Sequence, residues 1–121
     1  MSLAVLAVDD SRTMRDMLRL ALTDAGFSAH LAEDGAHALE MLDRLEPDVI
    51  ITDINMPRLD GFGLIGAVRA RPSHETTPIL VLTTESAPEL KAKARTAGAT
   101  GWIVKPFDPE KLVRALQMVA G

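Results

Sequence analysis

Five short apolar runs alternate with five stretches of helical periodicity, and this alternation restricts the fold more than any other feature of the chain. The runs are Leu3–Val8, Ser28–Leu31, Val49–Thr52, Ile79–Leu82 and Trp102–Val104. Four of them are continuous and rich in valine, isoleucine and leucine, which is typical of strands buried on both faces of a sheet. The second run alternates in polarity instead, which predicts an edge strand.

Each run is followed by a segment whose apolar residues recur at helical spacing. These stripes extend over Met14–Ala25, Ala36–Leu45, Leu64–Val68, Leu90–Ala97 and Leu112–Val119. Residues that can cap a helix N-terminus precede four of the stripes: Asp10 or Ser11, Asp34, Ser86 and Asp108. The segment from Ser86 to Glu89 has the spacing of a capping box, which predicts the start of the fourth helix.

Strictly alternating strands and helices indicate an α/β fold with a parallel sheet. We predict a single doubly wound (βα)5 domain over residues 1–121, with flavodoxin-like topology and helices on both faces of the sheet. The weak second strand fits an edge, which gives the five-stranded order 2-1-3-4-5 when crossovers are right-handed. In this order a crevice lies at the carboxyl ends of the first and third strands, where the winding reverses.

Composition excludes several classes of function. The net charge of −4 argues against a general nucleic-acid binder, and the absence of cysteine excludes disulfides and thiolate metal sites. No apolar run approaches the roughly 20 residues of a membrane helix, and the N-terminus lacks signal-peptide features. We therefore expect a cytoplasmic protein without a membrane or nucleic-acid partner. The scattered His30, His37 and His74 show no ligand spacing and are expected on the surface.

Four of the five predicted strands end with residues that can bind a phosphate or a cation. These strand-end residues are Asp9 and Asp10, Asp53, Thr83 and Thr84, and Lys105. One such residue alone is usually a loop cap or a solvated strand end. Because the carboxyl ends of parallel strands meet at one edge of the sheet, the combination predicts a shared site.

Three carboxylates in one crevice repel each other unless a cation offsets their charge. Magnesium takes oxygen ligands, commonly one or two carboxylates with phosphate and water, and Lys105 supplies a further positive charge. Asp53 is the best candidate nucleophile, because the central third strand places it between the acidic pair and Lys105. The hydroxyl of Thr83 and the ammonium of Lys105 are suited to bind a phosphoryl group on Asp53.

These residues, together with Asn55-Met56-Pro57, Gly61 and Lys105-Pro106-Phe107, resemble the full signature of two-component response-regulator receiver domains. The resemblance covers essentially the whole chain. It implies a signalling phosphoacceptor rather than an enzyme, in which Asp53 takes a phosphoryl group from the phosphohistidine of a sensor histidine kinase. It also implies a monomer.

The resemblance further implies a Mg²⁺ site, for which Mn²⁺ is an expected substitute. Asp10 and Asp53 are expected to ligate the metal directly, together with the backbone carbonyl of Asn55. Asp9 is expected to hold metal-bound water.

The phosphoryl oxygens are implied to bind Thr83 and Lys105, helped by the backbone N–H groups of Asn55 and Thr84. The peptide bond between Lys105 and Pro106 is expected to be cis, although only about one X-Pro bond in twenty is cis in folded proteins.

The chain is also similar to stand-alone chemotaxis regulators of the CheY type, in Thr83–Ser86 and Gly98–Phe107. Trp102 stands where that family carries an aromatic residue whose rotamer reports activation, so Thr83 and Trp102 are the expected switch residues. A plain core position is the alternative for Trp102. The implied output surface consists of the fourth helix, fifth strand and fifth helix, and the implied partner is a flagellar motor switch protein.

Three other functions remain open at this point. A lone receiver can act as a phosphate sink or relay without an output partner. An aspartyl-phosphate phosphatase usually needs a second acid near the nucleophile, whereas Asn55 stands two residues after Asp53. A flavin-binding protein would need a phosphate-binding loop where this chain has Asp9 and Asp10.

Overall fold

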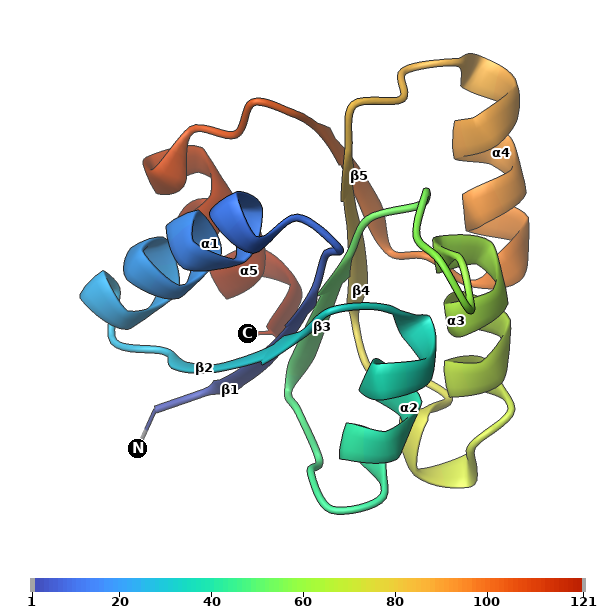
Figure 1. Cartoon of the computed structure of the whole chain (residues 1–121), viewed down its shortest axis with the longest axis horizontal. Helices are drawn as coiled ribbons and strands as arrows, with labels where there is room; N and C mark the ends of the chain where they lie inside the picture. Colours follow the sequence, from blue (N-terminus) through green and yellow to red (C-terminus); the bar gives the residue numbers. More distant parts are fainter. Residues whose placement is uncertain (1, 121) are drawn as a thin grey trace.

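The computed structural model describes residues 2–120, which form a five-stranded parallel sheet between two layers of helices (Figure 1). The strands are β1 (Ala4–Val8), β2 (Ser28–Ala32), β3 (Val49–Thr52), β4 (Ile79–Thr83) and β5 (Gly101–Val104). The helices are α1 (Arg12–Asp24), α2 (Gly35–Leu42), α3 (Gly61–Arg69), α4 (Pro88–Ala97) and α5 (Pro109–Ala120), with a short 3-10 helix at Pro72–His74. None of the helices within residues 2–120 is long and apolar enough to cross a membrane.

The sheet has the strand order β2-β1-β3-β4-β5, as the alternating pattern predicts. The central strands β1, β3 and β4 are almost completely buried, whereas β2 is half-buried at one edge. The fifth strand is less buried than its continuous apolar run suggests, because it forms the other edge and Val104 is 40% exposed. The order places β1 and β3 side by side at the point where the winding reverses.

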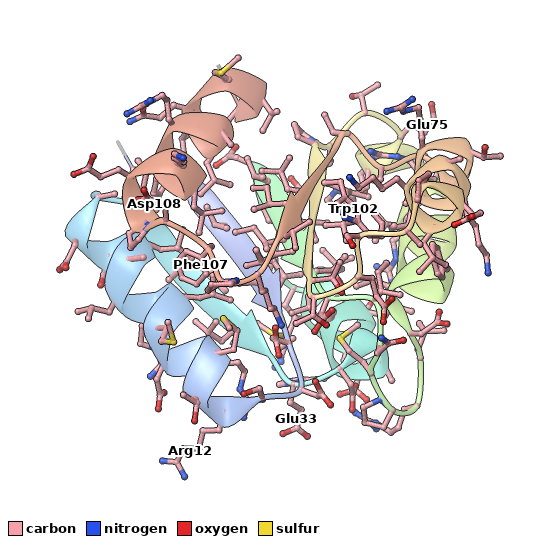
Figure 2. The ribbon with its side chains drawn as sticks, turned by 90° about the horizontal axis from the view of Figure 1, so that it is seen from above. Arg12, Glu33, Glu75, Trp102, Phe107 and Asp108 are labelled. Atoms are coloured by element: carbon pink, nitrogen blue, oxygen red, sulfur yellow. The ribbon has the colours of Figure 1, made fainter. Side chains whose placement is uncertain are left out.

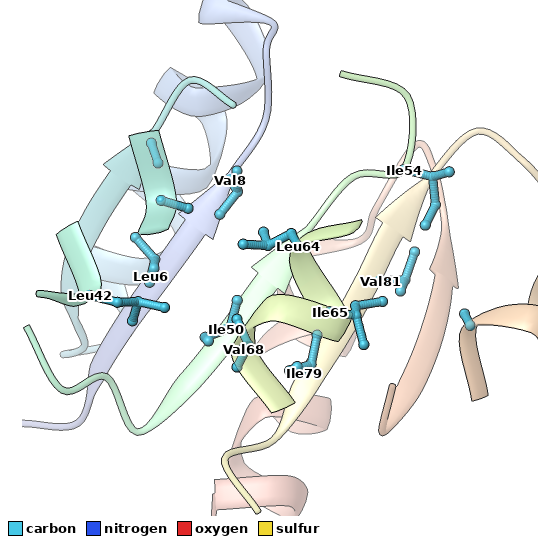
Figure 3. Close-up of a cluster of buried hydrophobic side chains, with 13 residues drawn as sticks. Leu6, Val8, Leu42, Ile50, Ile54, Leu64, Ile65, Val68, Ile79 and Val81 are labelled. Atoms are coloured by element: carbon cyan, nitrogen blue, oxygen red, sulfur yellow. The ribbon is translucent and has the colours of Figure 1, made fainter. Parts of the chain in front are cut away.

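The two faces of the sheet carry separate hydrophobic cores. On the face covered by α2, α3 and α4, Leu6 and Ile50 of the sheet share one cluster with Leu42 of α2 and with Leu64 and Ile65 of α3 (Figure 3). The other face is covered by α1 and α5 (Figure 1), and there Leu18 of α1 packs into a second cluster with residues of the sheet and α5. Both cores are dominated by fully buried Leu, Ile and Val side chains. This packing holds the carboxyl ends of the strands at one edge.

Two predicted helix ends are wrong. The second helix ends at Leu42 and not at Leu45, because the N–H groups of Asp43 and Arg44 bond to carbonyls three residues back and close a tight turn. The fourth helix has no capping box. Its N-cap is Ala87, which makes no side-chain cap bond and is extended, as a residue before proline prefers to be.

The prediction that all three histidines lie on the surface is also wrong. His74 is only 2% exposed, and its Nδ1 lies 2.9 Å from the hydroxyl of Thr77. His30 and His37 are half-buried, and Nδ1 of His37 accepts a hydrogen bond from the N–H of Glu33. A scattered polar residue can therefore be buried here when a neighbouring group satisfies its ring nitrogen.

Candidate phosphorylation site at the carboxyl edge of the sheet

Three carboxylates converge where β1 and β3 end. Asp9 and Asp10 follow β1, and Asp53 follows β3; one oxygen of each lies within 4.8 Å of the others. Asp9 is buried and Asp53 is nearly so, whereas Asp10 is exposed. The neighbouring backbones are held in register by a 3.0 Å hydrogen bond from the N–H of Asp53 to the carbonyl of Val8. The parallel pairing of β1 and β3 thus brings together acids that are 44 residues apart in the chain.

Lys105 neutralises part of this negative charge from the opposite side. Its Nζ lies 2.7 Å from Asp9 and 2.8 Å from Asp53, so one ammonium bridges two carboxylates. Burial lowers the pKa of Lys105, but the hydrogen bonds to Asp53 and Asp9 outweigh burial, and the net pKa is raised. Lys105 is therefore a fixed cation. The peptide bond that follows it, to Pro106, is cis, in agreement with the expectation.

Backbone groups fix the orientation of the two buried acids. The N–H of Ser11 donates to Oδ1 of Asp9 at 2.9 Å, and the N–H of Ile54 donates to Oδ1 of Asp53 at 2.6 Å. Gly61 lies so close to Asp53 that a Cβ there would collide with the carbonyl oxygen of Asp53. These contacts leave Oδ2 of Asp53 directed at Lys105.

Thr83 ends β4 and is completely buried, and the loop after it connects it to Trp102. The N–H of Glu85 makes a long hydrogen bond, 3.4 Å, to the Thr83 hydroxyl. The carbonyl of Glu85 accepts a 3.0 Å hydrogen bond from the indole Nε1 of Trp102. Trp102 is half-buried and packs against the core cluster that includes Ala94 of α4. Figure 2 shows Trp102 between β5 and α4. One backbone segment therefore contacts both expected switch residues.

Asn55 and Thr84 lie at the outer rim of the site and are exposed. The Asn55 amide donates to Oε1 of Glu85 at 3.2 Å, which joins the loop after β3 to the loop after β4. The structure thus brings Asp9, Asp53 and Lys105 into direct contact, with Asp10 beside the other two acids. Thr83 and Trp102 are connected by Glu85, which is hydrogen-bonded to both.

Arg58 and Asp34 form an ion pair beside the site. This pairing was not predicted from the sequence. Arg58 lies in the loop after β3, and its guanidinium binds both carboxylate oxygens of Asp34, at 2.7 and 2.9 Å. From the sequence, Asp34 is expected only as a helix cap. Two residues 24 positions apart in different loops leave no periodic signal that could connect them.

The donor set fits a hard divalent cation. Three carboxylates each present an oxygen to a common space, and these are ligands that Mg²⁺ prefers. Only Asp9 and Asp53 are bound to Lys105, and within residues 2–120 no salt bridge compensates the charge of the exposed Asp10. A divalent cation would offset it.

Comparison with known proteins identifies the family. The sequence model of the family described as the response regulator receiver domain matches residues 5–117, nearly the whole chain. The chain belongs to the response regulator receiver family. Receiver domains are signalling phosphoacceptors that interact with histidine kinases and bind Mg²⁺ in an acidic pocket.

The receiver domain has relatives among curated proteins and solved structures. It is 40% identical to the response regulator MprA of Mycobacterium leprae over 93% of this chain, but spans only 49% of that protein. It is 48% identical to the Vibrio cholerae chemotaxis protein CheY4, with a TM-score of 0.95 and coverage of 98% and 99% of the two chains.

A third solved structure bears on the metal. The receiver domain of the Pseudomonas aeruginosa sensor histidine kinase PA1611 has a magnesium ion coordinated in its active-site cleft. It is 27% identical to this chain, with a TM-score of 0.92 and coverage of 100% and 99% of the two chains.

Proposed function

We propose that residues 1–121 form one receiver domain that switches a signalling surface when Asp53 is phosphorylated. The observation that carries this proposal is the convergence of Asp9, Asp10 and Asp53 around Lys105 at the carboxyl edge of the sheet. A sensor histidine kinase is the donor. A carboxylate oxygen of Asp53 bonds to phosphorus while the phosphorus–nitrogen bond of the kinase phosphohistidine breaks, and the imidazole leaves with the electron pair.

Asp9, Asp10, Asp53 and the carbonyl of Asn55 would hold Mg²⁺, with Mn²⁺ as a substitute. The bound metal supplies positive charge that neutralises phosphoryl oxygens and aligns the donor. Lys105 already lies beside Oδ2 of Asp53 and would bind a phosphoryl oxygen without moving far. The Thr83 hydroxyl and the backbone N–H groups of Asn55 and Thr84 would bind the other oxygens.

The switch would run from Thr83 through Glu85 to Trp102. Movement of the Thr83 hydroxyl toward a phosphoryl group would remove the long hydrogen bond from the Glu85 N–H. The peptide of Glu85 also holds the Trp102 indole, so its movement would change the environment of the ring. Trp102 packs next to α4, and the surface of α4, β5 and α5 would therefore respond.

We infer a chemotaxis role from the identity of 48% to CheY4 over nearly the full length of both chains. The partner of the switched surface would then be a flagellar motor switch protein, and the domain would act in the cytoplasm as a monomer. A groove on β5 and α5, lined by apolar residues such as Trp102 and Phe107 and by the charged Asp108 and Lys111, supports binding of a protein segment there.

The proposal predicts a single phosphorylation on Asp53. Treatment with acetyl phosphate and Mg²⁺ should raise the intact mass by one phosphate, and Asp53→Asn should abolish the gain because an amide is not a nucleophile here. Adding EDTA should stop the reaction, and Mg²⁺ should restore it.

Asp43→Asn is the matched control, because Asp43 is an exposed acid that pairs with Arg71 away from the site. It should gain the phosphate like the wild-type chain. An undiminished gain in Asp53→Asn would show that another residue is the phosphoacceptor.

A further inference from the structure

The loop from Ile54 to Asp60 connects β3 to α3 and is tied to the neighbouring β2–α2 corner. Its main side-chain tie is the two-pronged contact of Arg58 with Asp34, through Nε at 2.7 Å and a terminal nitrogen at 2.9 Å. A backbone hydrogen bond from Gly35 to the carbonyl of Leu59, at 3.2 Å, lies beside it. A forked pair of charge-assisted hydrogen bonds fixes direction as well as distance.

Asp34 is a rigid anchor for this contact. It is the N-cap of α2, and its Oδ1 also accepts the N–H of His37 at 2.8 Å. The side chain is only 6% exposed, so it has little freedom to turn away. The hydrogen bonds from Arg58 hold the pKa of Asp34 below its usual value, and the carboxylate stays charged at neutral pH.

Arg58 makes this contact while its backbone is in an unfavourable conformation. Its φ is 67°, the one positive φ of a non-glycine residue within residues 2–120. Glycine or asparagine would adopt this conformation at a lower cost. The Arg58 side chain is 54% exposed, and both of its hydrogen bonds within residues 2–120 go to Asp34.

The loop that Arg58 holds is the one that carries Asn55. Its start is fixed by the N–H of Gly61, which donates to the carbonyl of Ile54 at 2.8 Å. On the side of Asn55 that faces β4, the one side-chain hydrogen bond among residues 2–120 is a 3.2 Å bond to the half-buried Glu85. The Arg58 contact is the firmer of the two side-chain ties.

We propose that Arg58, anchored on Asp34, is a positioning residue for phosphoryl transfer, which rests on the proposed function. It holds the loop so that the backbone of Asn55 faces the carboxylates. Arg58 itself makes no hydrogen bond to Asp9, Asp10, Asp53 or Lys105. Its removal therefore leaves the reacting groups in place but loosens the backbone that completes the site.

Two measurements on the same variants test this role. The first is hydrogen exchange of the amides of residues 54–60 without divalent metal, and the second is the rate of phosphorylation by acetyl phosphate with Mg²⁺. Arg58→Asn tolerates the positive φ and removes the contact. It should exchange faster in this loop and phosphorylate about tenfold more slowly. Arg58→Lys, which keeps one charged hydrogen bond, should recover part of both.

Asp34→Asn provides a second route to the same outcome, because the amide oxygen still caps α2 while the carboxylate charge is lost. It should resemble Arg58→Asn. Arg71→Asn is the matched control, since it removes another arginine–aspartate pair, 3.0 Å between Arg71 and Asp43, away from the loop. It should leave both measurements unchanged.

Wild-type exchange of residues 54–60 in Arg58→Asn, or an equal loss of rate in Arg71→Asn, would overturn the proposal. If the wild-type chain takes no phosphate at all, the proposed function fails, and the exchange comparison still decides whether Arg58 orders the loop.

Discussion

Lys105 has an environment unlike that of a surface lysine. Its side chain is 11% exposed and its ammonium contacts two carboxylates that would otherwise repel each other across the site. Removing one partner of a buried ion pair usually costs more than the pair itself contributes, because the remaining charge is left uncompensated. In this domain a divalent cation at the same carboxylates could take over that compensation.

Lys105→Met should therefore lower the free energy of unfolding in EDTA, by about 2 kcal/mol given the partial exposure of the pair. Mg²⁺ should recover more stability in the variant than in the wild-type chain, since the ammonium no longer competes for the same oxygens. Urea unfolding with EDTA and with Mg²⁺ measures both effects. Lys111→Met, on the exposed side of α5, should change neither. Equal Mg²⁺ increments in both chains would contradict the competition.

Residue types at strand ends predicted the members of the site but not all of their contacts. The convergence of Asp9, Asp10 and Asp53 followed from parallel pairing, which brings carboxyl ends to one edge. The second contact of Lys105, with Asp9, depends on the exact path of the chain after β5 and has no sequence signal. The pairing of Arg58 with Asp34 was missed for the same reason.

Helix α4 is held firmly at its C-terminal end and weakly at its start. Arg69 of α3 donates two hydrogen bonds, 3.0 and 2.8 Å, to the carbonyl of Gly98, which ends α4 with a φ of 117°. Lys93 lies 4.2 Å from the ring centroid of Phe62 on α3. At the other end, Ala87 provides no side-chain cap, and Ala94 is the one buried residue of the helix. Movement near Glu85 would therefore displace the start of α4 first.

Two glycine-to-alanine changes should have opposite effects. Gly98→Ala should lower the free energy of unfolding by about 1–2 kcal/mol, because a Cβ is disfavoured at positive φ and would lie 2.9 Å from the Arg69 side chain. Gly66→Ala should raise it by about 0.5–1 kcal/mol, because a Cβ in the middle of α3 meets nothing within 4 Å. Thermal or urea unfolding measures both. A stabilised Gly98→Ala would contradict the assignment of a fixed C-terminal end.

Element order was predictable, whereas some helix ends were not. Apolar runs and helical stripes identified every strand and every α-helix, since burial imposes both periodicities. The cap of α4 was predicted wrongly, because the spacing of Ser86 was weighed above Pro88, which makes Ala87 extended so that the helix starts one residue later. The burial of His74 depends on a hydroxyl in the following turn, at Thr77.

On the scale of the whole molecule, the strand order separates the three acids from the proposed output surface. The acids lie where β1 and β3 end, whereas Trp102 lies on the edge strand β5, beyond β4 (Figure 1). The loop after β4 is the direct connection, because Glu85 contacts Asn55, Thr83 and Trp102. The order 2-1-3-4-5, predicted from the sequence, places this loop between the three acids and the proposed output surface. The three contacts of Glu85 were not predictable from the sequence and were found in the structure.

The emission of Trp102, the only tryptophan in the chain, tests whether a phosphoryl group on Asp53 changes the surface around β5. Adding beryllofluoride with Mg²⁺ should shift the emission of the wild-type chain, with binding followed independently by fluorine NMR. Asp53→Asn should abolish both binding and the shift, and Thr83→Ala should keep binding but reduce the shift. Unchanged emission in the wild-type chain at saturating mimic would show that Trp102 is static core and that phosphorylation does not reach the surface through β4 and β5.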